Sequence, residues 1–81
     1  MVRKDGSAAL LGAFGAAVRR RRKELGLSQE TLGFRSQLDP TYISGIERGV
    51  RNPTLRSMAR LSRALGARIN KLVAEAELSA K

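Results

Sequence analysis

The sequence contains no cysteine and no histidine. The absence of cysteine excludes disulfides, iron–sulfur clusters and thiolate zinc sites. The absence of histidine removes the commonest metal ligand and the only side chain that titrates near neutrality when unperturbed. We therefore predict no metal site, no cofactor and no catalytic residues, and a protein that is not an enzyme.

The chain is also too short for an elaborate catalytic pocket. Its 81 residues permit one domain at most. Hydrophobic residues make up 42% of the sequence, which is enough to bury a core, so the composition is not that of a disordered chain.

Negative charge is scarce in this sequence. Sixteen Lys and Arg stand against seven Asp and Glu, which gives a net charge of +9 at pH 7. A small basic domain most often binds nucleic acid, and less often an anionic membrane. The longest weakly apolar run, residues 8–18, is interrupted by Gly12 and Gly15 and is too short to span a bilayer. We expect a cytoplasmic protein with no membrane partner.

Hydrophobic periodicity predicts a long first helix over about Ala8–Leu25. Ser7 is suited to cap its N-terminus, and Gly26 stands where a left-handed residue would end it. The apolar stripe of this helix consists of Leu11, Phe14, Val18 and Leu25.

Two short helices follow in the middle of the chain. Ser28 suits the N-cap of a helix over Gln29–Ser36, and Asp39 followed by proline starts a helix over Pro40–Arg48 that ends at Gly49. Only about two residues separate these helices, too few for an antiparallel pair, so we expect them to cross near a right angle as a helix-turn-helix. In that arrangement the second helix projects from the body of the domain and can enter the major groove of DNA.

The remaining residues predict two more helices and no strand. Thr54 caps a fourth helix that ends at Gly66, and a fifth helix follows. The core-facing residues expected in the last four helices are Leu32, Ile43, Ile46, Leu55, Met58, Leu61, Leu65, Ile69, Leu72, Val73 and Ala76. We predict an all-α fold with one domain over 11–75. Residues 1–10 are expected to be a flexible segment or an extension of the first helix, and residues 76–81 a polar tail.

Three separated segments carry a resemblance to a known family. Residues 26–32 (GLSQETL), 42–49 (YISGIERG) and 51–55 (RNPTL) are similar to Xre-type helix-turn-helix regulators, the superfamily of the lambda repressor and Cro. The resemblance extends from about Leu11 to Val73, and residues 38–48 (LDPTYISGIER) look especially like controller proteins of restriction–modification systems.

That resemblance implies a compact five-helix, lambda-repressor-like domain and a function in transcription. We expect a sequence-specific regulator that binds double-stranded DNA as a homodimer on a pseudo-palindromic operator, with no small-molecule effector. Two other functions stay open. One is an antitoxin-like or adaptor protein whose main partner is another protein and which autoregulates its operon. The other is a membrane-active or RNA-binding basic helix, which the regular caps and five-helix pattern argue against.

Arg22 falls on the apolar stripe of the first helix. A half-buried guanidinium needs an acceptor, and Glu47 is the carboxylate at the end of the helix expected nearby. Members of the resembled family use an Arg–Glu pair at these matching positions, which implies an ion pair that holds the first helix against the third. The alternative is that Arg22 reaches solvent with the rest of the basic block, Arg19–Lys23, which we otherwise expect to be mostly solvated.

The helix over Pro40–Arg48 carries the candidate base-reading residues on its exposed face. These are Thr41, Tyr42, Ser44 and Gly45. Hydroxyls at Thr41 and Ser44 can hydrogen-bond base edges or phosphates. The Tyr42 hydroxyl either meets a phosphate or its ring closes the edge of the core, and Gly45 is expected to let the helix approach the groove closely.

Phosphate contacts are expected from residues around this helix. The candidates are Gln29, Arg35, Arg48, Arg51, Asn52 and Arg56. Gln29 stands at a helix start, where its amide and the backbone N–H groups can meet a phosphate oxygen. Pro40 occupies a position where many relatives carry a base-reading side chain, so direct readout is expected to be thin. Specificity would then depend on Arg35, Arg48, water or DNA shape.

The fifth helix carries the candidate dimer interface. Leu72, Val73 and Ala76 are still apolar after the core stripe is complete. They either join two copies or simply close the core, and both can hold. A dimer would place two recognition helices in successive major grooves about 34 Å apart.

Overall fold

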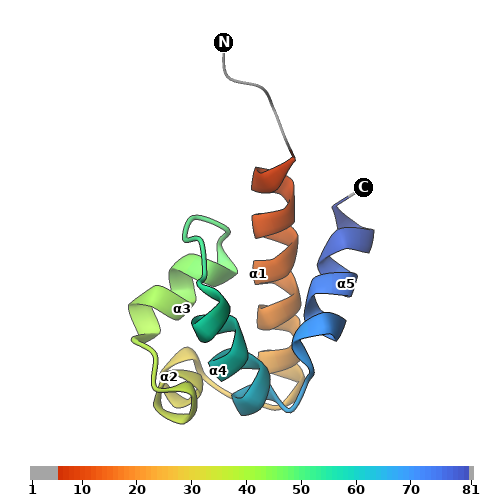
Figure 1. The fold of residues 1–81 in the computed structure, drawn as a ribbon. Helices are drawn as coiled ribbons and strands as arrows, with labels where there is room; N and C mark the ends of the chain where they lie inside the picture. Colours follow the sequence, from red (N-terminus) through yellow and green to blue (C-terminus); the bar gives the residue numbers. More distant parts are fainter. Residues whose placement is uncertain (1–5, 81) are drawn as a thin grey trace.

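The chain folds into five α-helices over residues 6–80, the part that the computed structural model describes (Figure 1). The helices are α1 (Ser7–Glu24), α2 (Gln29–Ser36), α3 (Pro40–Glu47), α4 (Leu55–Leu65) and α5 (Ile69–Ser79). No strand occurs among these residues, and the predicted all-α fold is confirmed. None of the five helices is long and apolar enough to cross a membrane.

Local sequence signals set most of the helix boundaries. The predicted caps Ser28, Asp39 and Thr54 each accept a hydrogen bond of 2.7 to 3.0 Å from a backbone N–H in the first turn. Left-handed glycines stand at or just beyond three helix ends, as predicted: Gly26, Gly49 and Gly66. Caps and ends of this kind depend only on neighbouring residues, which is why the pattern located them.

Both ends of the helical domain extend further than the sequence indicated. Ser7 is the first residue of α1 and not its cap, because Gly6 takes the N-cap position with φ at 79° and no side-chain bond. Residues 7–10 therefore extend the first helix, while residues 1–5 lie outside the described residues. At the other end, Ala76 is fully buried within α5 and is not part of a polar tail.

The core lies between α1 and the other four helices. Its buried hydrophobic residues are Phe14, Ala17, Val18, Leu32, Ile43, Ile46, Leu61, Leu65, Leu72 and Ala76. Two residues expected there are at the surface, Leu25 with 41% and Leu55 with 69% of its area exposed. Leu25 follows the last residue of α1 and Leu55 is the first residue of α4, so neither continues the stripe of its helix.

α1 packs against α3 and α5, while α2 packs against α3 and α4. α1 and α5 run side by side in opposite directions (Figure 1). Arg20 forms an ion pair with Glu75 across these two helices, and Arg21 Nε donates to the carbonyl oxygen of Leu65 at 3.0 Å. The basic block is mostly at the surface, as expected, since Arg19, Arg20 and Lys23 are exposed and only Arg22 is buried. Arg20 and Arg21 nevertheless bind groups of their own chain.

Candidate nucleic-acid interface

α2, a three-residue turn and α3 form the helix-turn-helix at one side of the molecule (Figure 1). Gln37 ends α2 in the left-handed conformation, with φ at 59°, and Leu38 N–H donates to the carbonyl oxygen of Gly33 at 3.0 Å. A Cβ at residue 33 would lie 2.7 Å from the carbonyl oxygen of Leu38. The turn can close this tightly because residue 33 has no side chain.

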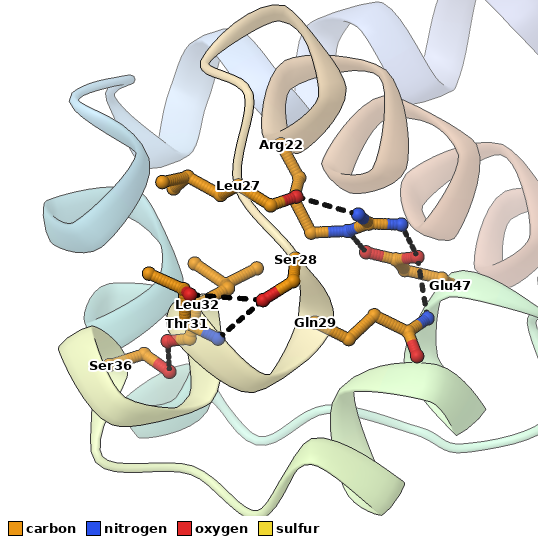
Figure 2. Close-up of polar contacts among 8 residues, drawn as sticks. All are labelled: Arg22, Leu27, Ser28, Gln29, Thr31, Leu32, Ser36 and Glu47. Atoms are coloured by element: carbon orange, nitrogen blue, oxygen red, sulfur yellow. Dashed lines mark hydrogen bonds and ion pairs between the residues drawn. The ribbon is translucent and has the colours of Figure 1, made fainter.

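A buried ion pair holds the helix-turn-helix against α1. Arg22 Nε donates to Glu47 Oε2 at 2.7 Å and its Nη2 to Oε1 at 2.9 Å, while Nη1 donates to the carbonyl oxygen of Leu27 at 2.8 Å. Each of the two charged residues is only 8% exposed. Figure 2 shows the guanidinium and carboxylate in a paired, parallel arrangement. The structure thus brings together the two residues expected to join the first and third helices.

The same ion pair fixes the start of α2. Gln29 Nε2 donates to Glu47 Oε1 at 3.0 Å, so this amide is turned toward the ion pair (Figure 2). The hydrogen bond from the Arg22 side chain to Glu47 raises the pKa of Arg22, against burial, which lowers it. The guanidinium is therefore a permanent charge, and it holds the carboxylate that orients Gln29.

An open hollow of about 570 Å³ lies between the start of α2 and the exposed face of α3. Its lining residues are Arg22, Ser28, Gln29, Glu30, Pro40, Thr41 and Ser44. Thr41 and Ser44 thus share one concave surface with Gln29, as a surface that reads DNA requires. Pro40 occupies the first turn of α3 at the same rim and offers no hydrogen-bonding side chain.

Two candidate base-reading residues make contacts within the chain: Tyr42 takes the second of its two expected places, at the edge of the core, and Gly45 does not lie at the exposed surface. Tyr42 is half-buried, and its hydroxyl donates to Ser57 Oγ of α4 at 3.3 Å. Gly45 is buried, and the space beside it is filled by the side chain of Arg51. Both residues therefore serve contacts within the chain, and neither presents a free side-chain group to a groove.

The phosphate candidates are dispersed around this surface. Gln29 lines the hollow. Arg48 and Arg51 are exposed just after α3, and Arg56 is exposed in the first turn of α4, and none of these three lines the hollow. Arg35 lies apart, in an adjacent hollow around Phe34. Asn52 lines a different, apolar hollow between α1 and α5. The structure thus separates Arg35 and Asn52 from the concave surface that holds Thr41 and Ser44.

The candidate dimer residues are mostly used inside the chain. Leu72 is 2% exposed and Ala76 is fully buried in the core, so neither side chain is available to a second copy. Of the two roles expected for them, the structure shows the closing of the core, because α5 packs them against α1. Val73 is partly exposed and lines the hollow of about 230 Å³ that also contains Leu10 and Pro53.

Two residues of this region were not among the predicted site residues. Ser57 of α4 accepts a hydrogen bond from the Tyr42 hydroxyl at 3.3 Å, and Phe34 of α2 is 87% exposed. Ser57 stands at the third position of α4, where its backbone N–H donates to the Thr54 cap. No local pattern indicates that its hydroxyl also accepts from a tyrosine fifteen residues earlier in the chain.

Comparison with known proteins agrees with this arrangement of helices. Residues 18–72 match the helix-turn-helix family. Control protein C.BamHI of Bacillus amyloliquefaciens is 48% identical over 54 residues, which cover 65% of this chain and 67% of that protein. The crystal structure of the restriction–modification controller protein C.AhdI from Aeromonas hydrophila superimposes with a TM-score of 0.75 and 45% identity, covering 76% of this chain and 94% of that one.

A second solved structure matches a larger part of the chain. The clp gene regulator ClgR from C. glutamicum has a TM-score of 0.84 at 33% identity, covering 89% of this chain and 92% of that one. The family match over residues 18–72 includes the helix-turn-helix, both residues of the ion pair that supports it and all of α4. The chain therefore belongs to the Xre-type helix-turn-helix family of DNA-binding transcriptional regulators and is related to the controller proteins of restriction–modification systems.

Proposed function

We propose that this regulator binds a pseudo-palindromic operator as a homodimer, with α3 of each copy in the major groove. One observation carries the proposal: Thr41 and Ser44 of α3 share a concave surface with the first turn of α2. Exposed arginines follow in the chain, Arg48 and Arg51 just after α3 and Arg56 in the first turn of α4. The helix that reads bases is thus accompanied by groups that can bind phosphates.

The first turn of α2 is the first phosphate contact. The initial N–H groups of a helix have no partner within the helix and point toward an anion placed at its end. Since Glu47 orients the Gln29 side chain, the backbone N–H groups carry this contact and the amide steadies it. Arg48, Arg51 and Arg56 bind phosphates at the far side of the groove, and Arg35 and Asn52 make contacts at the margins of the site.

Base recognition rests on Thr41 and Ser44. Their hydroxyls can donate to or accept from base edges, and the Thr41 methyl group can contact a thymine. Two short side chains in each half-site, with Pro40 beside them, leave most of the specificity to water and to the shape and deformability of DNA. The operator should therefore contain positions that affect affinity without a direct side-chain contact.

The homodimer is proposed to form over the hollow between α1 and α5. This hollow is lined mainly by apolar side chains, including Leu10, Leu11, Met58 and Val73. Leu10 is 37% exposed and Val73 is partly exposed, so a second copy would cover apolar surface that a monomer leaves in water. Two copies joined there present two α3 helices to one face of a duplex.

The relatives named as control proteins support a role in a restriction–modification system. A neighbouring methyltransferase and endonuclease gene pair would agree with that role. A neighbouring toxin gene would instead favour the antitoxin-like function, in which a protein partner comes first.

Selection of fragments from the source genome, followed by footprinting, tests the DNA-binding proposal. We expect two protected half-sites centred about 34 Å apart and related by a pseudo-twofold axis. A dimer that neutralises about eight phosphates should show a log–log salt slope near −7. Protection of a single half-site would contradict the homodimer, and a slope near zero would contradict the phosphate contacts.

A further inference from the structure

Gly45 of α3 leaves a space that the aliphatic stem of Arg51 fills. A Cβ at residue 45 would lie 2.2 Å from Arg51 Cγ and 3.3 Å from its Cδ. The loop after α3 also doubles back over this residue, because the N–H groups of Val50 and Arg51 both donate to the Gly45 carbonyl oxygen, at 3.0 and 3.2 Å. Arg51 thus contacts Gly45 in two ways: its backbone N–H donates to the Gly45 carbonyl oxygen, and its aliphatic stem packs against the Gly45 backbone.

The other end of the Arg51 side chain rests on an aromatic ring. Its Cζ lies 5.5 Å from the centroid of the Tyr42 ring, within the range of a cation–π interaction. The ring is held in turn by α4, since the Tyr42 hydroxyl donates to Ser57 Oγ, which also accepts from Thr54 Oγ1 at 2.9 Å. Arg51 is therefore held at its stem by Gly45 and at its head by Tyr42.

We propose that Gly45 is a positioning residue for Arg51: by lacking a side chain, it lets α3 hold the Arg51 guanidinium in place before DNA arrives. The cation–π contact with Tyr42 occupies none of the N–H donors of the guanidinium, so these donors can bind an anion. An arginine that is already ordered loses less side-chain freedom on binding a phosphate. This proposal rests on the proposed function, in which Arg51 binds a phosphate of the operator.

The geometry argues against a direct role of Gly45 at the groove. Gly45 is buried, and a Cβ added to it would point toward the side chain of Arg51. Close approach of α3 to base edges would instead depend on Thr41, which is exposed, and Ser44, which is half-buried, since both line the hollow. The effect of a substitution at residue 45 should therefore pass through Arg51.

A double-mutant cycle with Gly45→Ala and Arg51→Ala tests this coupling on the selected operator. Gly45→Ala should weaken binding about fivefold per half-site by displacing the Arg51 stem. It should also lower the salt slope, because a phosphate contact weakens. In the Arg51→Ala background the same substitution should have no further effect on the dissociation constant or the slope.

Gly12→Ala is the matched control for a helical glycine. A Cβ at residue 12 meets nothing within 4 Å, and Gly12 lies on α1, away from the hollow between α2 and α3. It should leave operator affinity unchanged. Thermal unfolding of each variant checks the fold. Gly45→Ala should stay folded because the three atoms nearest the new methyl group belong to the exposed side chain of Arg51, which can move aside.

The free protein gives a second readout that does not depend on DNA. The Tyr42 ring should shift the NMR resonances of the Arg51 δ protons upfield, and Gly45→Ala should abolish that shift. A shift that persists in Gly45→Ala would overturn the positioning role, whether or not the protein binds DNA. A parent protein that binds no duplex DNA would instead refute the proposed function.

The remaining outcomes of the cycle are also decisive. Unchanged operator affinity in Gly45→Ala would overturn the proposal. Equal losses from Gly45→Ala in the presence and absence of Arg51 would mean that Gly45 acts on DNA directly, and would overturn it as well. An unchanged salt slope in Arg51→Ala would remove the phosphate contact of Arg51 and the proposal with it, while other contacts could still support operator binding.

Discussion

Gly15 of α1 lies directly against Ile46 of α3, so close that a Cβ at residue 15 would stand 2.1 Å from the Ile46 carbonyl oxygen. The same Cβ would lie 2.7 Å from the carbonyl oxygen of Glu47. The two helices therefore meet backbone to backbone, next to the residue that binds Arg22. The absence of a side chain at residue 15 sets the distance over which the buried ion pair forms.

Gly15→Ala should destabilise the fold, although alanine is the better helix former. The new methyl group has only backbone atoms to displace, and overpacking of this kind costs about 2 kcal/mol or more. In a domain of this size that loss lowers Tm by about 10 °C. Gly12→Ala, in the same helix but with open space at its Cβ, should raise Tm slightly. Equal changes of Tm in the two variants would contradict the close contact.

Glu47→Ala should also reduce stability, because it leaves the Arg22 guanidinium buried without its carboxylate. We expect a loss of about 3 kcal/mol, near the lower end for a broken buried pair, since Arg22 borders an open hollow. Glu24→Ala is the control, because Glu24 faces Arg21 at 3.6 Å in an exposed pair and should contribute less than about 1 kcal/mol. Urea denaturation measures both losses, and a smaller loss for Glu47→Ala than for Glu24→Ala would refute the structural role.

The contribution of Arg22 should not depend on pH over the ordinary range. Its hydrogen bond to Glu47 raises the pKa of the guanidinium in the folded chain. A cation whose pKa is raised on folding stabilises the folded state fully at any pH below its pKa in the unfolded chain. This stabilisation is lost only as the pH rises through its pKa in the folded chain. The stability difference between the parent and Glu47→Ala should therefore stay constant from about pH 6 to pH 10. Denaturant titrations across that range that showed the difference shrinking with rising pH would contradict this.

Ser44→Ala and Arg48→Ala should separate base recognition from phosphate binding. Ser44 lines the hollow beside Thr41, so its loss should change the preference between operator sequences by about 1 to 3 kcal/mol and leave the salt slope unchanged. Arg48 is exposed beyond α3, and its loss should weaken all sequences alike and reduce the slope by about 1 per subunit. Competition binding with an operator library at several salt concentrations measures both. A uniform loss from Ser44→Ala would remove it from base recognition.

Features that depend on neighbouring residues could be predicted from the sequence. Asp39 followed by Pro40 gave the start of α3 because a cap and a fixed φ are local properties. The Arg22–Glu47 ion pair could also be anticipated, since a charge on an apolar stripe requires a partner and the resembled family has one at these positions. The fold class and the two short helices followed from signals of this kind.

Features that depend on distant residues could not be predicted. The Arg51 side chain packs against Gly45 only because the loop after α3 turns back over that helix. No neighbouring residue indicates which side chain fills the space beside Gly45. The ion pair of Arg20 with Glu75 depends on the register of α1 against α5. Leu72 and Ala76 were candidates for an interface with a second copy because the sequence does not show how many residues of α5 are buried in the core.

Assembly should depend on the hollow between α1 and α5. Leu10→Asp and Val73→Asp each place a charge in this apolar hollow, and desolvating that charge should raise the dimer dissociation constant at least about tenfold. Phe34→Ser is the control, because Phe34 is the most exposed large hydrophobic residue described and lies on α2, outside this hollow.

Sedimentation velocity over a range of protein concentrations distinguishes the outcomes, with thermal unfolding to confirm that each variant is folded. The two Asp variants should sediment as monomers at concentrations where the parent and Phe34→Ser are dimers, and they should bind the operator more weakly in proportion. A parent that is monomeric at every concentration would refute the homodimer. If Phe34→Ser dissociates while the Asp variants stay dimeric, the interface lies on α2, and the apolar side chains between α1 and α5 only close the core.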